Sequence, residues 1–436
     1  MLSIIIILSI ALAIFLGYRT KINTGLFCIV FAYIIGCFVM GLKPKQIIGF
    51  WPTSTMFVIL SVSLFYNFAA INGTLEKMSG ALLYACRNFP GLLPYALFAV
   101  AVILSVMGAT FFTVLAFLAP ITLVICDESR MDKLTGAVAI NCGALAGGNF
   151  PTSNLGVVFR GLSDTAYEAS PEIAAVDSFN MEMKIFAFAI FFSLILITIF
   201  RFGFKENRNI GKGVTFKKPE SFTKDQKTTL TLMMAMMAVV LIFPLLNILM
   251  PGNAAVKYIS GKVDVGLVAI IFTVIALLLK LAPQKEAIAK VPWNTIIMIA
   301  GAGMLIAVAV EAGTIEALST WIGSNVPKPL VPIAFCLVGA IMSFFSSTTG
   351  VVAPALFPLI PNLAASVGLS APVLFACTIL GAQSSAISPF SSGGSLILGS
   401  TPKEEERNEL FNRLLMVAVP ISVITCTIYN FVIAMV

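Results

Sequence analysis

The sequence predicts an all-α polytopic membrane protein made of two inverted halves, each with five transmembrane helices and one re-entrant hairpin. The chain is too apolar for a soluble domain, since its mean hydropathy is +1.01 and only 11% of its residues are charged. Its second half repeats the first at an offset of about 240 residues, so that Asn72–Glu76 corresponds to Ala312–Glu316. Internal duplication in an apolar chain is typical of secondary transporters, whose two related halves enclose one site.

Ten apolar segments have the length needed to cross a bilayer. They lie at residues 2–18, 23–40, 53–71, 134–159, 183–200, 230–250, 265–281, 293–310, 372–398 and 414–436. Arg19 and Lys21 follow the first segment and do not precede it, so we expect a retained helix and not a signal peptide.

Two further apolar stretches, 91–126 and 329–367, are too long for one helix and carry small polar residues in the middle. We predict that both are re-entrant hairpins, which are tolerated where protein or a water-filled cavity satisfies their backbone. The predicted first repeat is 1–202 (scaffold helices 1–71, hairpin 91–126, broken helix 134–160), and the second is 228–436 (scaffold helices 228–311, hairpin 329–367, broken helix 371–399). Residues 73–86 and 313–322 are either interfacial helices or plain connectors.

The distribution of basic residues supports this topology. With the basic linker 203–227 placed in the cytoplasm, 20 of the 27 Lys and Arg residues fall on the inner side, as the positive-inside rule requires. Both termini are then outside, and the outer loop 161–181 is acidic. The net charge of +7 therefore reports topology and implies no nucleic-acid partner.

Several kinds of chemistry are disfavoured. The chain has no histidine and no CxxC spacing among its eight cysteines, so a zinc site, a disulfide framework and a serine–histidine enzyme are not expected. The sequence also places no Asp or Glu in the middle of a predicted span, with Glu311 at a span end and Asp264 at a span start. Because proton relays usually need such groups, sodium coupling or plain exchange is favoured over proton symport.

The candidate site comprises the two hairpin tips and two polar breaks within spans. Helix N-termini and hydroxyl groups there suit an anion, whereas unwound carbonyls and Ser, Thr and Asn oxygens suit sodium. We predict that substrate is bound by Thr110, Thr152, Ser153, Asn154, Ser347, Thr348, Ser391, Ser392 and Gly393. Candidate sodium sites involve Gly108, Ala109, Gly148, Asn149, Ser346, Thr349, Ala386 and Ser388. The competing interpretation, that Ser and Gly only allow close helix packing, explains less well why four such stretches are duplicated in register.

These residues resemble the ion transporter superfamily, specifically its divalent anion/sodium symporters and the related malonate and dicarboxylate carriers. The resemblance rests on Pro292–Thr295 followed by Gly301–Gly303, on Asn72–Leu75, on the hairpin turns before Pro120 and Pro358, and on the break Asn149–Asn154. It implies that the tips bind sodium and a substrate carboxylate, and that a transport domain slides, elevator-like, against a dimeric scaffold. The family's tip motif is Ser-Asn-Thr, and the tips here, Gly108–Thr110 and Ser346–Thr348, lack its asparagine.

Together these features predict a multi-pass carrier of the bacterial inner membrane that transports di- or tricarboxylates such as malonate, succinate or malate. The expected coupling ion is sodium, no other cofactor is implied, and the expected assembly is a homodimer. Transport of sulfate or arsenite-type anions, or carboxylate exchange, would use the same scaffold. A channel or an intramembrane enzyme is less consistent with the sequence.

Overall fold

The structure, a computed structural model, describes residues 2–20, 22–85, 90–210, 220–250, 253–260, 262–344, 348–401 and 403–435. Every regular element in these ranges is a helix. Five of the described helical stretches are long and apolar enough to cross a membrane, and eight shorter apolar helices accompany them. The prediction of an all-helical, multi-span membrane protein is confirmed.

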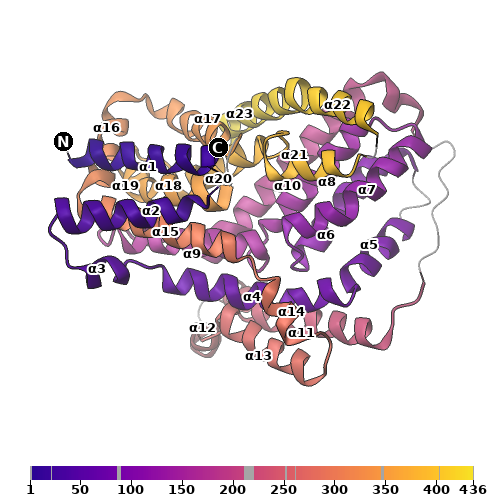
Figure 1. Cartoon of the computed structure of the whole chain (residues 1–436), viewed down its shortest axis with the longest axis horizontal. Coiled ribbons are helices and arrows are strands. Elements are labelled where there is room, and N and C mark those ends of the chain that lie inside the picture. The colour runs from indigo at the N-terminus through magenta and orange to yellow at the C-terminus, as the bar shows by residue number, and fades with distance from the viewer. Residues whose placement is uncertain are drawn as a thin grey trace.

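The first part of the chain contributes two helices of 19 residues, α1 and α4, and several shorter ones. They are α1 (Leu2–Thr20), α2 (Thr24–Tyr33) with a π-helical extension (Ile34–Val39), α3 (Pro44–Gly49), α4 (Thr53–Ile71) and α5 (Thr74–Ala85). Proline residues start α3 and precede α4, where their missing N–H costs nothing. In Figure 1, α1, α2 and α15 lie side by side at the left of the molecule.

The next five helices are α6 (Leu93–Val106), α7 (Phe111–Ser129), α8 (Lys133–Gly148), α9 (Asn154–Glu168) and α10 (Ser178–Gly203). Of these, α6, α7, α8 and α10 lie at the right of Figure 1, and α9 lies farther to the left. A short turn at 107–110 joins α6 to α7, and the polar stretch 149–153 separates α8 from α9. The prediction of an outer loop at 161–181 is wrong for residues 161–168. Helix α9 continues to Glu168, so Asp164 and Glu168 are helical.

The second half of the chain begins with the helices along the lower edge of Figure 1. These are α11 (Lys224–Leu249), α12 (Ala254–Ser260), α13 (Val265–Leu278) and α14 (Gln284–Ala289), followed by α15 (Trp293–Glu311) and α16 (Thr314–Asn325). The later elements are α17 (Val331–Phe344), a segmented helical run from Thr348 to Val367 that includes α18 (Ala353–Leu356) and α19 (Ile360–Val367), α20 (Ala371–Ser384), α21 (Ser392–Gly399), α22 (Glu404–Arg413) and α23 (Val419–Met435).

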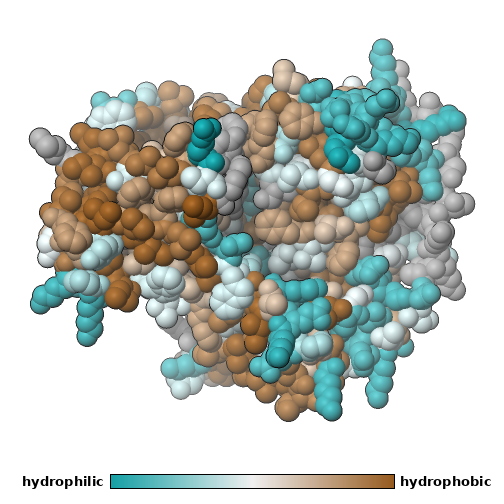
Figure 2. All heavy atoms as spheres, viewed as in Figure 1, coloured by the Kyte–Doolittle hydropathy of each residue, from teal (hydrophilic) through white to brown (hydrophobic). Residues whose placement is uncertain are grey.

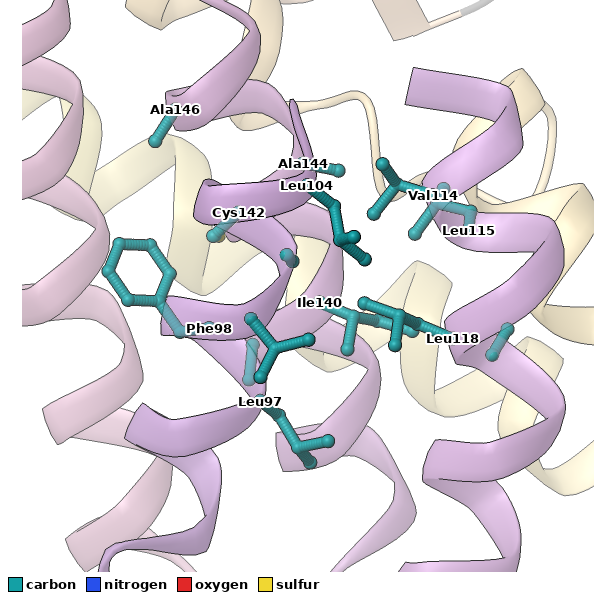
Figure 3. Close-up of a cluster of buried hydrophobic side chains, with 14 of the residues drawn as sticks. Leu97, Phe98, Leu104, Val114, Leu115, Leu118, Ile140, Cys142, Ala144 and Ala146 are labelled. Atoms are coloured by element: carbon teal, nitrogen blue, oxygen red, sulfur yellow. The ribbon is translucent and has the colours of Figure 1, made fainter. Parts of the chain in front are cut away.

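Two close helix pairs position the site. Helix α6 packs along α8, and α17 packs along α20. Glycine makes both contacts possible: a β-carbon at Gly143 would lie 2.5 Å from the Phe98 carbonyl oxygen, and one at Gly381 would lie 2.3 Å from that of Cys336. Around the first pair, apolar side chains of α6, α7 and α8 form a shared core (Figure 3) that fixes the position of both arms around the 107–110 turn.

The outer surface of the helices is apolar where lipid would contact it. Large exposed hydrophobic side chains include Leu8 and Phe15 on α1, Phe38 beyond α2, and Ile271 and Leu278 on α13. Figure 2 shows broad hydrophobic areas over α1, α2 and the lower helices, and hydrophilic side chains gathered near α22. This distribution is expected of a protein that lies in a bilayer and exposes only its edges to water.

Candidate functional site

A cavity of about 460 Å³ lies where the 107–110 turn, the helical run that begins at Thr348 and the two helix breaks meet. Its walls come from α4, α7, α8, α9, α20 and the segments after α17 and α20. The polar side chains that line it are Asn67, Thr110, Thr113, Asn154, Lys290, Ser343, Thr348, Thr349, Gln383 and Ser391. Residues more than 200 positions apart in the chain therefore surround one space of a size that suits a small molecule.

Two threonines from far apart in the chain line this cavity, one in the 107–110 turn and one at the start of the helical run at 348–367. Thr110 caps α7, where its hydroxyl accepts a hydrogen bond from the Thr113 amide at 3.2 Å and lies 2.8 Å from the Thr113 hydroxyl. On the other side, the Thr348 hydroxyl lies 3.2 Å from that of Ser343. The turn at Gly108 has a φ of +93°, and a β-carbon there would lie 2.2 Å from the Tyr66 ring, so only glycine brings the turn this close to α4.

The two helix breaks are held by serines that play the same part. Ser153 precedes α9 and its hydroxyl donates to carbonyl oxygens of Gly147, Gly148 and Phe150. Ser391 precedes α21 and donates in the same way to the carbonyl oxygens of Ala386 and Ser388. Each serine hydroxyl thus adds to the backbone hydrogen bonds at the end of one helix and helps to hold the break in shape.

A pair of amide side chains joins the two breaks across the molecule. Asn149, which ends α8, donates from Nδ2 to Oε1 of Gln383 at 3.0 Å, and Gln383 donates from Nε2 to Oδ1 of Asn149 at 2.7 Å. Both side chains are buried, and Gln383 also lines the cavity. Because an unpaired buried amide is costly, this reciprocal pair fixes the two breaks relative to each other.

The charge of the cavity wall is positive. Among the described residues that line it, Lys290 carries the sole formal charge, and its ion pair with Glu286 is long, at 3.8 Å. Lys290 follows α14, lies outside the predicted spans, and reaches the edge of the cavity. The N-termini of α7, α9 and α21 add positive partial charge to the same wall.

The predicted site residues divide into three groups. Those that line the cavity are Thr110, Asn154, Thr348, Thr349, Ala386, Ser391 and Gly393. Those that are buried in the turns or breaks behind its wall are Gly108, Ala109, Gly148, Asn149, Thr152, Ser153 and Ser388. Ser346 and Ser347 lie outside the described residues, as does the side chain of Ser392, whose backbone begins α21. Gln383, Thr113, Ser343 and Asn67 also line the cavity and were not expected from the sequence.

A second cavity, of about 590 Å³, lies at the other end of α9. Its wall includes Arg160, Asp164 and Glu168 of α9, with Asp264 and Glu311 from other helices. The two cavities share the helices α4 and α9 but no lining residue. The chain therefore has a mainly acidic cavity at one end of α9 and the amide- and hydroxyl-lined cavity at the other.

One carboxyl group that the sequence places just outside a predicted span is buried within a helix. Glu182 lies one turn inside α10 and is fully buried, because this helix begins at Ser178, well before the predicted span at 183. Neither of its carboxylate oxygens has a hydrogen-bond partner.

Comparison with known proteins identifies the kind of molecule. Residues 1–148 match the family model described as the N-terminus of the dicarboxylate carrier protein MatC, and residues 255–434 match the model described as a citrate transporter. A search of curated proteins finds no match. The family resemblance seen in the sequence is thereby confirmed, and both matched models describe transporters and not enzymes.

Solved structures of transporters share the fold. The YdaH transporter of Alcanivorax borkumensis superposes with a TM-score of 0.66 at 18% identity, over 89% of this chain and 87% of that one. MtrF of Neisseria gonorrhoeae, from a class of antimetabolite efflux pumps, gives a TM-score of 0.62 at 14% identity, over 93% of this chain and 84% of that one. At these identities the likeness concerns the fold alone.

Proposed function

Since the chain is a carrier of the ion transporter superfamily, related to dicarboxylate and citrate carriers, we propose that it is a secondary active transporter of small organic anions. The expected substrates are di- or tricarboxylates such as malonate, succinate or malate, and the expected coupling ion is sodium. The observation that carries this proposal is the 460 Å³ cavity, whose described lining holds hydroxyls, amides, helix N-termini and Lys290 but no carboxylate.

The chemistry of the wall favours a carboxylate over other solutes. Hydroxyl groups of Thr110 and Thr348 and the amides of Asn154 and Gln383 can donate hydrogen bonds to carboxylate oxygens from several sides. An anion with two carboxylates would contact the α7 turn with one end and the α9 or α21 N-terminus with the other. Sodium would be held at the broken helix ends, where the carbonyl oxygens behind Asn149 and Ala386 lie close to the cavity.

An inverted-repeat elevator is the mechanism that we propose for this carrier. Its support is the register of the helices: α3, α4 and α5 have counterparts in α14, α15 and α16 whose bounds are all displaced by 240 residues. The two predicted hairpins, 91–126 and 329–367, with α8, α9, α20 and α21 would form the mobile part, and α1 to α4 with α11 to α15 the scaffold of a homodimer. Both termini would face outward and the linker 203–227 the cytoplasm.

The test is uptake of labelled malonate, succinate, malate, citrate and sulfate into proteoliposomes, with and without a sodium gradient. We expect saturable uptake of at least one carboxylate and its stimulation by inward-directed sodium. Uptake of sulfate without any carboxylate would overturn the substrate class and favour the inorganic-anion alternative. Equal carboxylate uptake with and without a sodium gradient would overturn the proposal of sodium coupling. Single-channel currents would show that the protein is a channel and not a carrier.

A further inference from the structure

Helices α9 and α10 run antiparallel and face each other along one stripe of side chains on each. At the outer end of this contact, the Ser178 hydroxyl donates to Oδ2 of Asp164 at 3.3 Å. At its inner end, the ring of Phe150 in the first break lies 5.2 Å from that of Phe186. Residues 178, 182 and 186 of α10 share one face because they are four apart, so Glu182 occupies the middle of this interface.

The residue opposite Glu182 is Arg160, which lies one turn before Asp164 on α9. Its guanidinium donates from Nη1 to the carbonyl oxygen of Pro151 at 3.2 Å, and it lies 5.4 Å from the centre of the Phe179 ring. The Nε atom of Arg160 is buried without a hydrogen-bond partner, as are both oxygens of Glu182. The arginine thus holds the first helix break and makes no hydrogen bond to the neighbouring carboxyl group.

Other ionisable groups on the elements around α10 do not offer Glu182 a partner. Among the described side chains they are Asp164, Tyr167 and Glu168 on α9, Lys133 and Cys142 on α8, Cys377 on α20, Cys426 and Tyr429 on α23, Tyr95 on α6, Lys205 and Glu206 after α10, and Glu172, Asp177, Lys184 and Arg201 before or along α10. Lys184 is exposed and is turned away, since two residues rotate a helix by about 200°. Of the described groups, Arg160 is the one whose charge acts on Glu182.

A fully buried, unpaired carboxylate is costly enough that the group is neutral in this arrangement. We propose that Glu182 is a proton-binding site of the transport cycle, so that a proton moves with the carboxylate in addition to the sodium of the proposed function. The carboxyl group is protonated while Arg160 holds the Pro151 carbonyl. Loss of the proton leaves a carboxylate that draws Arg160 away from the break, and in this way protonation is linked to the shape of the substrate cavity.

The first test needs no substrate. Infrared difference spectra of the purified wild-type protein are recorded between acidic and alkaline buffers, to follow the band of a protonated carboxyl group. We expect a band that is lost on alkalinisation and is absent in Glu182→Gln. The control variant Glu168→Gln, which changes an exposed carboxylate of the 590 Å³ cavity, should retain the band. A wild-type spectrum identical to that of Glu182→Gln would overturn the proposal, whether or not the protein transports carboxylate substrates.

The second test is proton movement in proteoliposomes that contain a pH-sensitive dye. Substrate should drive proton entry in the wild type and in Glu168→Gln, and a pH gradient should stimulate uptake in both. Glu182→Gln should lose both effects while sodium-driven uptake persists, and Glu182→Asp should recover them in part. Proton entry in Glu182→Gln at the wild-type rate would overturn the proposal. Absence of uptake under any gradient, with the infrared band intact, would instead contradict the proposed carrier function.

Discussion

At the scale of single residues, the reciprocal pair of Asn149 and Gln383 is the contact on which the cavity depends most. Both amides are buried, and together they make two hydrogen bonds of 3.0 and 2.7 Å between helices 234 residues apart. The pair does not follow the register of the repeat, in which Asn149 corresponds to Ile387. Each half of the molecule therefore supplies a different partner, and the centre of the site is asymmetric.

Replacement of either partner should show this dependence. Gln383→Leu and Asn149→Leu each leave a buried amide without its hydrogen bonds, which costs about 1–3 kcal/mol. We expect each variant to unfold at a lower temperature in detergent and to lose most of its uptake. The double variant should be no less stable than the worse single variant, because no unpaired amide remains.

A double-mutant cycle on the midpoint of thermal unfolding measures the coupling. Gln226→Leu serves as the matched control, because Gln226 caps the start of α11 far from the cavity and its loss should leave uptake unchanged. Additive effects of the two central substitutions would contradict the assigned pair.

At the scale of elements, a cluster of charges connects α22 to the first half of the chain. Lys133, which begins α8, pairs with Asp127 at 2.9 Å and with Glu406 of α22 at 2.6 Å. Close by, Arg413 at the end of α22 pairs with the buried carboxylate of Asp132 at 2.7 Å. Because these contacts join both halves, α7, α8 and α22 should move together in any elevator motion.

Removal of the arginine from this cluster should be costly for stability. Arg413→Met leaves the Asp132 carboxylate, which is only 2% exposed, without its counter-charge, and we expect a loss of about 3 kcal/mol. Arg407→Met is the matched control, since Arg407 donates only to the Thr401 carbonyl oxygen. Equal thermal midpoints in the two variants would show that the ion pair contributes nothing.

The sequence predicts elements far better than it predicts contacts between them. Hydropathy and helix-breaking residues locate α4 and α15 within a residue or two, because these signals are local. It misses Gln383 and Lys290 in the cavity and Glu182 in the interior. The placement of these three side chains depends on how helices pack, which no local pattern contains.

At the scale of the whole molecule, the elevator proposal requires that the second hairpin slide past the scaffold. Gly350, after the second turn, lies against Met298 of α15: a β-carbon at Gly350 would be 3.0 Å from Met298 Cγ. Neither residue lines the 460 Å³ cavity. A bond between these positions would therefore block movement of the hairpin without filling the substrate space.

In a background without native cysteines, Met298→Cys and Gly350→Cys introduce a pair of cysteines that can form a disulfide. We expect this disulfide to abolish carboxylate uptake, and its reduction to restore uptake. The control disulfide joins Gly339→Cys and Ala382→Cys, within the proposed mobile part, where the two β-carbons would lie 3.7 Å apart and match disulfide geometry. It should leave uptake intact, because both positions move as one body. If the first disulfide forms and uptake is as fast as in the protein whose disulfide has been reduced, the hairpin does not slide against α15 and the elevator mechanism is contradicted.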